Sequence, residues 1–324
     1  MSYSNQTYIK ASQTLEKRRK KAERIQLARK LEISEKIPEI TKFEAELAQT
    51  GLAVIKGIGM GENAEEYIKQ LSEINLAIQE NIKKLLSANG YPEDYLEIPY
   101  NCKKCSDTGF VGGYVCECRK ELLKETAKDE LASVSASAKC SFDNFDVTYY
   151  PLPVDQNLGV SPQNRMKSVM EYCRCYAEDF DNESESLYMH GATGLGKTHL
   201  SLAIANVVTE NGYNVIYDSA QNIFTSLERE KFSYSGNGER EKELLECDLL
   251  IIDDLGSEFV TSFTTSALYN IINTRINRSK PVIISTNLTE TELEDKYTQR
   301  VTSRIIGNYV SLLFLGKDIR QLKK

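Results

Sequence analysis

The stretch Leu187-Tyr-Met-His-Gly-Ala-Thr-Gly-Leu-Gly-Lys-Thr198 decides the fold of this 324-residue chain. It opens with a short apolar run, passes through three glycines and continues into a helical pattern that reaches Glu210. The spacing Gly191-x-x-x-x-Gly196-Lys197-Thr198 is typical of a loop whose backbone N–H groups surround phosphate oxygens at the start of a helix. We therefore predict a strand, a phosphate-binding loop and a helix, in that order.

The loop residues have distinct predicted tasks. Lys197 should contact the β- and γ-phosphates of ATP, and the Thr198 hydroxyl should ligate Mg²⁺. The predicted nucleotide-binding set is Gly191, Ala192, Thr193, Gly194, Leu195, Gly196, Lys197, Thr198 and His199. A chance glycine-rich turn would not explain why strand, loop and helix occur together.

A second apolar run, Leu249-Leu-Ile-Ile252, ends in two carboxylates, Asp253 and Asp254. Four consecutive apolar residues suit a central strand of a parallel sheet, and ligands bind at the carboxyl ends of such strands. Asp253 is the predicted partner of Mg²⁺, and Asp254 is predicted to orient or deprotonate an attacking water. The alternative is a polar turn after a strand, which does not explain two acids at this distance from the loop.

Polar and basic residues farther along the chain complete the predicted site. Asn287 follows the apolar strand that ends at Thr286, and it could bond the γ-phosphate or the attacking water. Arg300, Arg304 and Arg320 come last, and a guanidinium can stabilise the charge that develops on a transferred phosphoryl group. A surface ion pair remains the alternative for each arginine.

Apolar strands alternate with helical patterns in the second half of the chain. Strands are expected at 187–190, 214–217, 248–253 and 281–286, and helices at 198–210, 220–231 and 262–278. This alternation predicts an α/β fold, a parallel sheet covered by helices on both faces.

The first half of the chain reads as helical. A Lys/Glu/Ala/Leu-rich stretch at 10–50 is broken near Pro38, and a second pattern places apolar residues on one helix face before Asn89-Gly90. That face carries Ile68, Leu71, Ile74, Ile78, Ile82 and Leu85. A polar helix and tether are expected at 119–138. We predict two domains, 1–136 and 137–324.

Two cysteine pairs lie within the first predicted domain, after its second helical pattern. Cys102-x-x-Cys105 and Cys116-x-Cys118 could hold Zn²⁺ in a tetrahedral site, with glycines forming the tight turns. A closed site of four sulfurs would be structural, because no position remains open for a substrate. The alternative is four unrelated thiols in a reducing compartment.

Composition excludes some classes. The chain has no apolar run of about 18 residues and no secretory signal, so we expect no membrane span and a cytoplasmic location. Its 40 basic and 47 acidic residues give a net charge of −7, which disfavours strong autonomous DNA binding. A basic run at 17–30 could meet phosphates or an acidic protein surface, or could be a solvated helix face.

Taken together, residues 140–324 resemble the AAA+ ATPases, and within them the bacterial DnaC/DnaI helicase loaders. The resemblance rests on the phosphate loop, Leu249–Gly256, Ile284-Ser-Thr-Asn287, Arg300–Arg304 and Gly316–Arg320. It implies that Asn287 is sensor 1, Arg304 the arginine finger with Arg300 beside it, and Arg320 the sensor-2 arginine. It also implies a sheet without a C-terminal helical lid, preceded by a helical N-terminal domain with a small zinc knuckle.

The resemblance implies a function as well. The chain would be a Mg²⁺-dependent ATPase that loads a hexameric DnaB-type replicative helicase onto single-stranded DNA. ATP binding and slow hydrolysis would switch its self-assembly, since Asp254 stands where many AAA+ proteins carry the longer Glu. The zinc-bearing N-terminal domain would grip the helicase, and single-stranded DNA would bind only weakly. The alternatives are an IstB-type transposition helper and a DNA-binding regulatory ATPase.

The resemblance extends to an aromatic lead-in. Phe142-Asp-Asn-Phe145 and Tyr149-Tyr-Pro151 look like the segment that opens the ATPase domain in this group. These residues could line an adenine pocket or pack in the core, and the sequence does not choose between the two.

Overall fold

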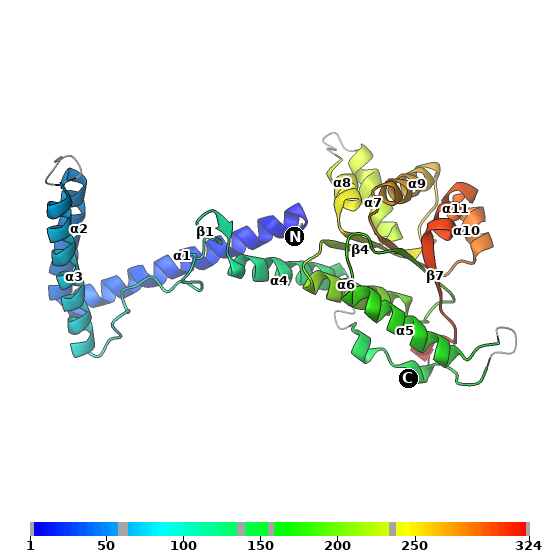
Figure 1. The fold of residues 1–324 in the computed structure, drawn as a ribbon, viewed down its shortest axis with the longest axis horizontal. Coiled ribbons are helices and arrows are strands. Elements are labelled where there is room, and N and C mark those ends of the chain that lie inside the picture. The colour runs from blue at the N-terminus through cyan, green and yellow to red at the C-terminus, as the bar shows by residue number, and fades with distance from the viewer. Residues whose placement is uncertain (1–2, 58–63, 135–139, 155–158, 233–237, 322–324) are drawn as a thin grey trace. The chain divides into compact units, whose positions relative to one another are not determined.

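The computed structural model describes residues 3–57, 64–134, 140–154, 159–232 and 238–321, which belong to two compact units (Figure 1). One unit comprises Met1–Ala11 and Lys120–Lys324, and the other Ser12–Arg119. This division by packing does not test the functional boundary predicted between residues 136 and 137, which stays a prediction. Residues 135–138 of the expected tether lie outside the described part.

A five-stranded parallel sheet forms the centre of the larger unit, in the order β4-β5-β6-β3-β7. Four strands lie close to where the sequence predicts them, and β7 was not predicted. Its pattern, Tyr-Val-Ser-Leu-Leu, is short and directly follows a helix, so no turn signal marks its start. The strands are β3 (Ser186–His190), β4 (Val215–Ser219), β5 (Leu249–Leu255), β6 (Val282–Thr286) and β7 (Tyr309–Leu313).

Helices cover both faces of this sheet, as the α/β prediction requires. α5 (Pro162–Glu178) and α6 (Lys197–Glu210) lie side by side on one face (Figure 1). The other face carries α7 (Ala220–Phe232), α8 (Glu239–Glu246), α9 (Ser262–Asn277), α10 (Glu290–Tyr297) and α11 (Gln299–Asn308). Alternate residues of β5 join the two apolar clusters, Leu249 and Ile251 toward α5 and α6, Leu250 and Ile252 toward the opposite face. This alternation follows from the two-residue period of a strand.

Arg275 ties together the starts of the neighbouring strands β5 and β6. The side chain is fully buried, yet the guanidinium donates to four backbone carbonyls, which offset the cost of burying a charge. Those carbonyls belong to Leu244 (2.8 Å), Cys247 (3.0 Å), Asp248 (3.3 Å) and Pro281 (2.8 Å). The residues leading into β5 and β6 are thereby held together from one side chain on α9.

The smaller unit is helical and carries a short hairpin. α1 (Asn5–Lys36) contributes its residues from Ser12 onward, and α2 (Pro38–Gly57) begins at the predicted break because proline is favoured at the first helical position. α3 (Ala64–Ala88) ends before Gly90, whose φ of 80° confirms the left-handed cap. The core comprises Ile33, Ile37, Ile40, Ile78, Ile82 and Leu86.

Two expectations about the helical half need adjustment. Ile74 belongs to the predicted apolar face of α3, but its side chain is 49% exposed. The polar helix expected from residue 119 is α4 (Glu117–Val134), which begins two residues earlier and packs with the larger unit from Lys120 onward. The hairpin before it consists of β1 (Phe110–Val111) and β2 (Tyr114–Val115).

Short elements complete the described chain. Two 3-10 helices, η2 (Phe142–Asn144) and η3 (Val147–Tyr149), lead into α5, and the described residues after β7 include one more, η4 (Ile319–Gln321). No helix in the described ranges combines the length and the apolar character that crossing a membrane demands.

Candidate functional site

The predicted phosphate loop opens onto a cavity of about 550 Å³. This volume lies within the range of small-ligand sites, and the cavity sits at the carboxyl ends of the parallel strands, where α/β sheets bind ligands. Most of the predicted site residues line it, namely Thr193, Gly194, Leu195, Gly196, Lys197, Thr198, His199, Asp253, Asp254, Asn287 and Arg320. The structure therefore brings together residues that lie up to 127 positions apart (193 to 320).

The loop backbone depends on glycine at its first position. Gly191 has a φ of 140°, and a Cβ there would lie 2.4 Å from the carbonyl oxygen of Phe314. No side chain fits this approach, because the obstacle is backbone rather than a flexible side chain. Phe314 also donates its N–H to the His190 carbonyl (2.8 Å), so the chain after β7 packs directly against the loop.

Lys197 is held inside the loop by three acceptors. Its ammonium group donates to the carbonyls of Gly191 (2.6 Å) and Ala192 (2.8 Å) and to Oδ1 of Asn287 (2.7 Å). Burial lowers the pKa of Lys197 to about 8, and the carboxylates of Asp254 and Asp253 oppose this shift. A phosphate ligand would supply the negative charge that this cation lacks at close range, so Lys197 is poised to exchange neutral partners for phosphate oxygens.

Asp253 is the most heavily bonded acid of the site. The buried carboxylate accepts hydrogen bonds from the hydroxyls of Thr198 (3.0 Å to Oδ2), Tyr217 (2.6 Å to Oδ2) and Ser285. Burial, together with the neighbouring Asp253 charge, raises the pKa of Tyr217 far above its usual range, so the phenol stays protonated and donates. The Thr198 and Asp253 oxygens together fit an octahedral Mg²⁺ that keeps several of its waters.

Sequence reasoning missed Tyr217 and Ser285. Tyr217 lies in β4 and Ser285 in β6, on either side of Asp253 in the sheet, so both reach the carboxylate from neighbouring strands. The available signal was a hydroxyl near the carboxyl end of each predicted strand. Hydroxyls are common in strands, however, and only the strand order shows which of them face the acid.

Asp254 and Asn287 form a pair beside Lys197. The Asn287 amide donates to Oδ1 of Asp254 (2.7 Å), and the Asp254 backbone N–H donates to the Ser285 hydroxyl (2.9 Å). Asp254 has a φ of 54°, a left-handed conformation that costs a non-glycine residue free energy and recurs at functional sites. Both side chains that are predicted to face the γ-phosphate, Asp254 and Asn287, line the cavity.

Aromatic side chains close the other end of the cavity. Tyr150 donates its hydroxyl to the Leu195 carbonyl (2.8 Å), and Phe145 lies edge-on to the His199 ring at 5.4 Å between centroids. Both Phe145 and Tyr150 are buried in the apolar cluster and also line the cavity, so core packing is confirmed, and a contact with adenine stays a prediction.

The three predicted arginines separate. Arg320 lines the cavity, whereas Arg300 and Arg304 lie exposed on α11 and do not line it in the described part of the chain. They are four residues apart and therefore one helical turn apart on the same face. On their own chain they do not meet the cavity, so any role in phosphoryl transfer would act on another copy.

The four predicted zinc ligands converge. The four sulfur atoms lie within 4.8 Å of one another, with 3.8 Å between Cys102 and Cys116 and 3.4 Å between Cys105 and Cys118. A tetrahedral site with Zn–S bonds of about 2.3 Å needs sulfur atoms about 3.8 Å apart. The donor set therefore fits Zn²⁺ and leaves no open coordination position.

The backbone around these cysteines is ordered by Asp107, which sequence reasoning did not single out. The buried carboxylate accepts the N–H groups of Asn101 (3.0 Å) and Cys102 (2.9 Å). The backbone N–H of Cys105 holds the pKa of the Cys102 thiol at about 7, which favours the thiolate that a metal requires.

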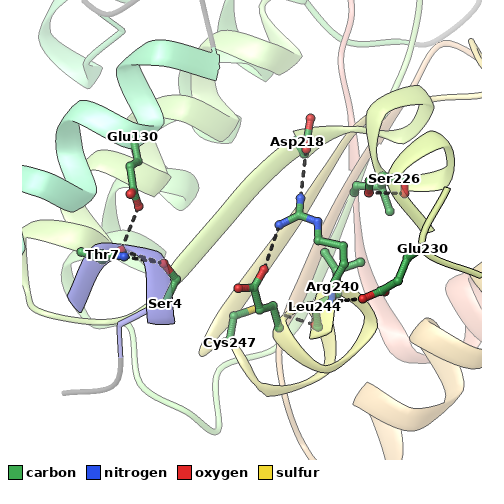
Figure 2. Close-up of polar contacts among 11 residues, drawn as sticks. Ser4, Thr7, Glu130, Asp218, Ser226, Glu230, Arg240, Leu244 and Cys247 are labelled. Atoms are coloured by element: carbon green, nitrogen blue, oxygen red, sulfur yellow. Dashed lines mark hydrogen bonds and ion pairs between the residues drawn. The ribbon is translucent and has the colours of Figure 1, made fainter. Parts of the chain in front are cut away.

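A second cavity, of about 520 Å³, lies against the edge strand β4. Figure 2 shows that polar and charged side chains at this cavity bond to one another. Arg240 donates to Asp218 (3.1 Å), and the Thr7 hydroxyl donates to Glu130 (2.8 Å). The backbone N–H of Arg240 donates to Glu230 (3.1 Å) as well. Because these polar groups satisfy each other, we assign no ligand to this cavity.

Comparison with known proteins agrees with a phosphate-binding loop at this cavity. Residues 164–306 match the family model described as IstB-like ATP binding protein. The replicative helicase loader DnaC of Escherichia coli K12 is 27% identical over 162 residues, which cover 49% of this chain and 65% of that protein. The DnaC loader of Buchnera aphidicola from Acyrthosiphon pisum is 24% identical over 191 residues, covering 57% and 71%.

A solved structure, the crystal structure of the DnaC helicase loader, aligns with a TM-score of 0.46 and 25% identity over 54% of this chain and 97% of that one. In the sequence comparison, this chain spans slightly less than two thirds of the length of the E. coli DnaC loader. It contains an IstB-like ATP-binding domain homologous to the DnaC loaders. Its parallel sheet flanked by helices, preceded along the chain by a helical N-terminal region, confirms the AAA+ fold class expected from the sequence.

The lowered pKa of Lys197 predicts how nucleotide affinity depends on pH. Phosphate oxygens bind the protonated lysine, so binding raises its pKa and affinity is highest below the free-protein value of about 8. Above pH 8 the Kd of a fluorescent ATP analogue should rise toward about tenfold per pH unit. The replacement Lys197→Arg, which keeps its charge, should flatten the profile. An affinity that stays constant from pH 7.5 to 9.5 would contradict the assignment.

The cysteine geometry predicts one zinc ion per chain. Metal analysis of purified protein should give a stoichiometry near one, and Cys116→Ser should lose most of the metal because a ligand is missing. Cys175→Ser is the matched control, since Cys175 is exposed and outside the cluster. Loss of the metal should also open residues 101–118 to proteolysis. Equal zinc content in the two variants would reject the site.

Proposed function

We propose that this protein is an ATP-dependent loader of a DnaB-type replicative helicase, acting on single-stranded DNA. The observation that carries the proposal is the cavity at the carboxyl edge of the sheet, where Lys197, the Thr198–Asp253 pair and the Asp254–Asn287 pair face one space. The homologous loaders supply the biological context.

ATP hydrolysis follows from the arrangement of these groups. The phosphate loop and Lys197 hold the triphosphate, and Thr198 with Asp253 would hold Mg²⁺, which neutralises charge on the phosphate oxygens. Asp254 accepts a proton from, or orients, the attacking water, and the Asn287 amide fixes that carboxylate at 2.7 Å. An aspartate at this position reaches less far than a glutamate, so turnover is slow and suits an assembly switch.

Arg300 and Arg304 act across a boundary between copies. Both guanidinium groups are exposed on α11 and lie away from the cavity of their own chain. In an assembly of ATPase domains, they reach the γ-phosphate held by a neighbour, where a guanidinium stabilises the charge of the transition state. Arg320 lines the cavity of its own chain, and there it contacts the phosphates of the nucleotide that this chain binds.

The zinc-bearing smaller unit grips the helicase. Four cysteines that hold Zn²⁺ make a rigid platform from a segment with few core residues. The hairpin β1–β2 on this platform exposes the apolar residues Phe110, Val111, Tyr114 and Val115, and an exposed apolar patch is typical of a protein-binding surface. Single-stranded DNA binds weakly, in keeping with the acidic net charge.

A transposition helper of the IstB type is the second candidate. The family match over residues 164–306 favours it as directly as it favours a loader, because it concerns the ATPase domain alone. The cysteine cluster and helical N-terminal half lie outside that match, and they favour the loader.

Replacing Arg304 tests assembly in trans. Arg304→Ala should leave ATP affinity unchanged and weaken ATP-dependent self-association about tenfold or more, the loss expected for a charged hydrogen bond. Arg278→Ala is the matched control, since Arg278 is exposed at the end of α9, before β6 begins. Sedimentation measures the association. Unchanged assembly in Arg304→Ala would reject the role of this residue between copies.

Capture from a host lysate tests the loader function itself. The protein, loaded with a non-hydrolysable ATP analogue, should retain the replicative helicase, and a Cys102→Ser, Cys105→Ser variant should not. Cys175→Ser should retain it as the unmodified protein does. Recovery of a transposase instead would favour the second candidate, and recovery of neither would contradict both.

A further inference from the structure

The turn that follows β5 is tied to the far end of α10 by a buried carboxylate. Glu258 is 5% exposed, and one of its oxygens accepts the Gly256 N–H (2.9 Å). The other oxygen accepts the hydroxyl of Tyr297, the last residue of α10 and fully buried. A carboxylate is expensive to bury unless it is hydrogen-bonded, so this contact holds the turn and the helix end together.

A second hydrogen bond joins the same turn to the same end of α10. Lys296, the residue before Tyr297, donates its ammonium group to the Gly256 carbonyl. Gly256 thus donates to Glu258 and accepts from Lys296, and it lies two residues after Asp254 in a turn closed by Ser257 N–H to the Asp254 carbonyl (3.1 Å). A shift of Asp254 is therefore passed directly to the last two residues of α10.

The other end of α10 is attached to Asn287. α10 begins at Glu290, with Thr289 as its N-cap, so a single residue, Leu288, separates the cap from the predicted γ-phosphate sensor. The side-chain oxygen Oδ1 of Asn287 accepts from Lys197, and the side-chain amide N–H donates to Asp254, both at 2.7 Å. A γ-phosphate that takes Lys197 as its partner removes the first of these bonds and changes what holds Asn287.

α11 follows α10 after a single residue. Thr298 has a φ of 77° and a ψ of 152°, an uncommon conformation for a residue other than glycine, and α11 begins at Gln299. Val301 and Ile305 of α11 are buried, while Arg300 and Arg304 project from its exposed side. The helix that carries these arginines is therefore joined along the chain to the end of α10 through Thr298 alone.

We propose that Glu258 and Tyr297 are positioning residues that transmit the state of the γ-phosphate site through α10 to the arginines of α11. This inference rests on the proposed ATP-dependent function and assigns its internal regulation. ATP alters the Lys197–Asn287–Asp254 contacts, α10 responds at both ends, and α11 changes its orientation before any neighbour binds. ADP has no γ-phosphate to compete for Lys197 and leaves α11 as it is in the free protein.

Backbone hydrogen exchange of α11 tests the coupling. The measurement uses full-length protein at a concentration too low for self-association, with Mg²⁺ and either ADP or a non-hydrolysable ATP analogue. In the unmodified protein, the exchange of α11 should differ between the two nucleotides. In Tyr297→Phe, which removes only the hydroxyl, this difference should disappear while the affinity for the ATP analogue stays within about twofold.

Tyr188→Phe is the matched control. Tyr188 is buried in the same apolar cluster, and its hydroxyl has no hydrogen-bond partner among the described residues, so its loss should leave the α11 response intact. Glu258→Gln removes the charge and should reduce the response as Tyr297→Phe does. If Tyr297→Phe does not bind nucleotide, Glu258→Gln decides the question by the same measurement.

Two results would overturn the proposal: an α11 response in Tyr297→Phe equal to that of the unmodified protein, or no response in the unmodified protein when it binds the ATP analogue. Because the readout needs no assembly and no helicase, it stands apart from the proposed function. An α11 response without helicase retention would refute the loader function and leave the coupling intact. Helicase retention without the α11 response would support the loader function and refute the coupling.

Discussion

The carboxylate of Asp253 is the point on which the larger unit depends. It is buried at the carboxyl edge of the sheet, where an ionised group survives only with close hydrogen-bond donors. The three hydroxyls that satisfy it come from Thr198 on α6, Tyr217 on β4 and Ser285 on β6. One charge thereby fixes the register of β4, β5 and β6 relative to the helix that begins at the phosphate loop. The same oxygens that stabilise the fold are those that suit Mg²⁺.

Charge is arranged around this acid so that the site is preorganised and yet adjustable. Lys197 is bonded to two carbonyls and an amide oxygen, all neutral, and burial lowers its pKa to about 8. Phosphate oxygens carry negative charge, so they would bind this cation more strongly than its present neutral partners do. The γ-phosphate of a bound ATP would compete for Lys197, a hydrogen-bond partner of Asn287, which in turn donates to Asp254. Under the proposed coupling, nucleotide binding and the conformational response would share these few contacts.

The smaller unit is stabilised in a different way. The segment between α3 and α4 has few core residues, and Asp107, the short hairpin and four converging thiols order it in place of a hydrophobic core. Metal ligation supplies folding free energy where burial cannot. A surface built in this way can expose apolar residues such as Phe110 and Tyr114 without losing its shape. The two units thus carry separate chemical features, the phosphate-loop cavity in one and the four-cysteine cluster in the other.

The sequence by itself determined the phosphate loop, the acidic strand end, four of the five strands and the cysteine cluster. Each of these is carried by a short stretch of sequence, and the cysteine cluster spans only residues 102–118. Tertiary structure alone decided which hydroxyls satisfy Asp253, that β7 completes the sheet, and that Glu258 meets Tyr297. Those contacts join residues 55, 36 and 32 positions apart at Asp253, and 39 apart at Glu258, so no window of sequence contains them. Strand order brings Tyr217 and Ser285 to Asp253, and the packing of α10 against the turn after β5 brings Tyr297 to Glu258. Only the tertiary structure makes these elements neighbours, because they are far apart along the chain.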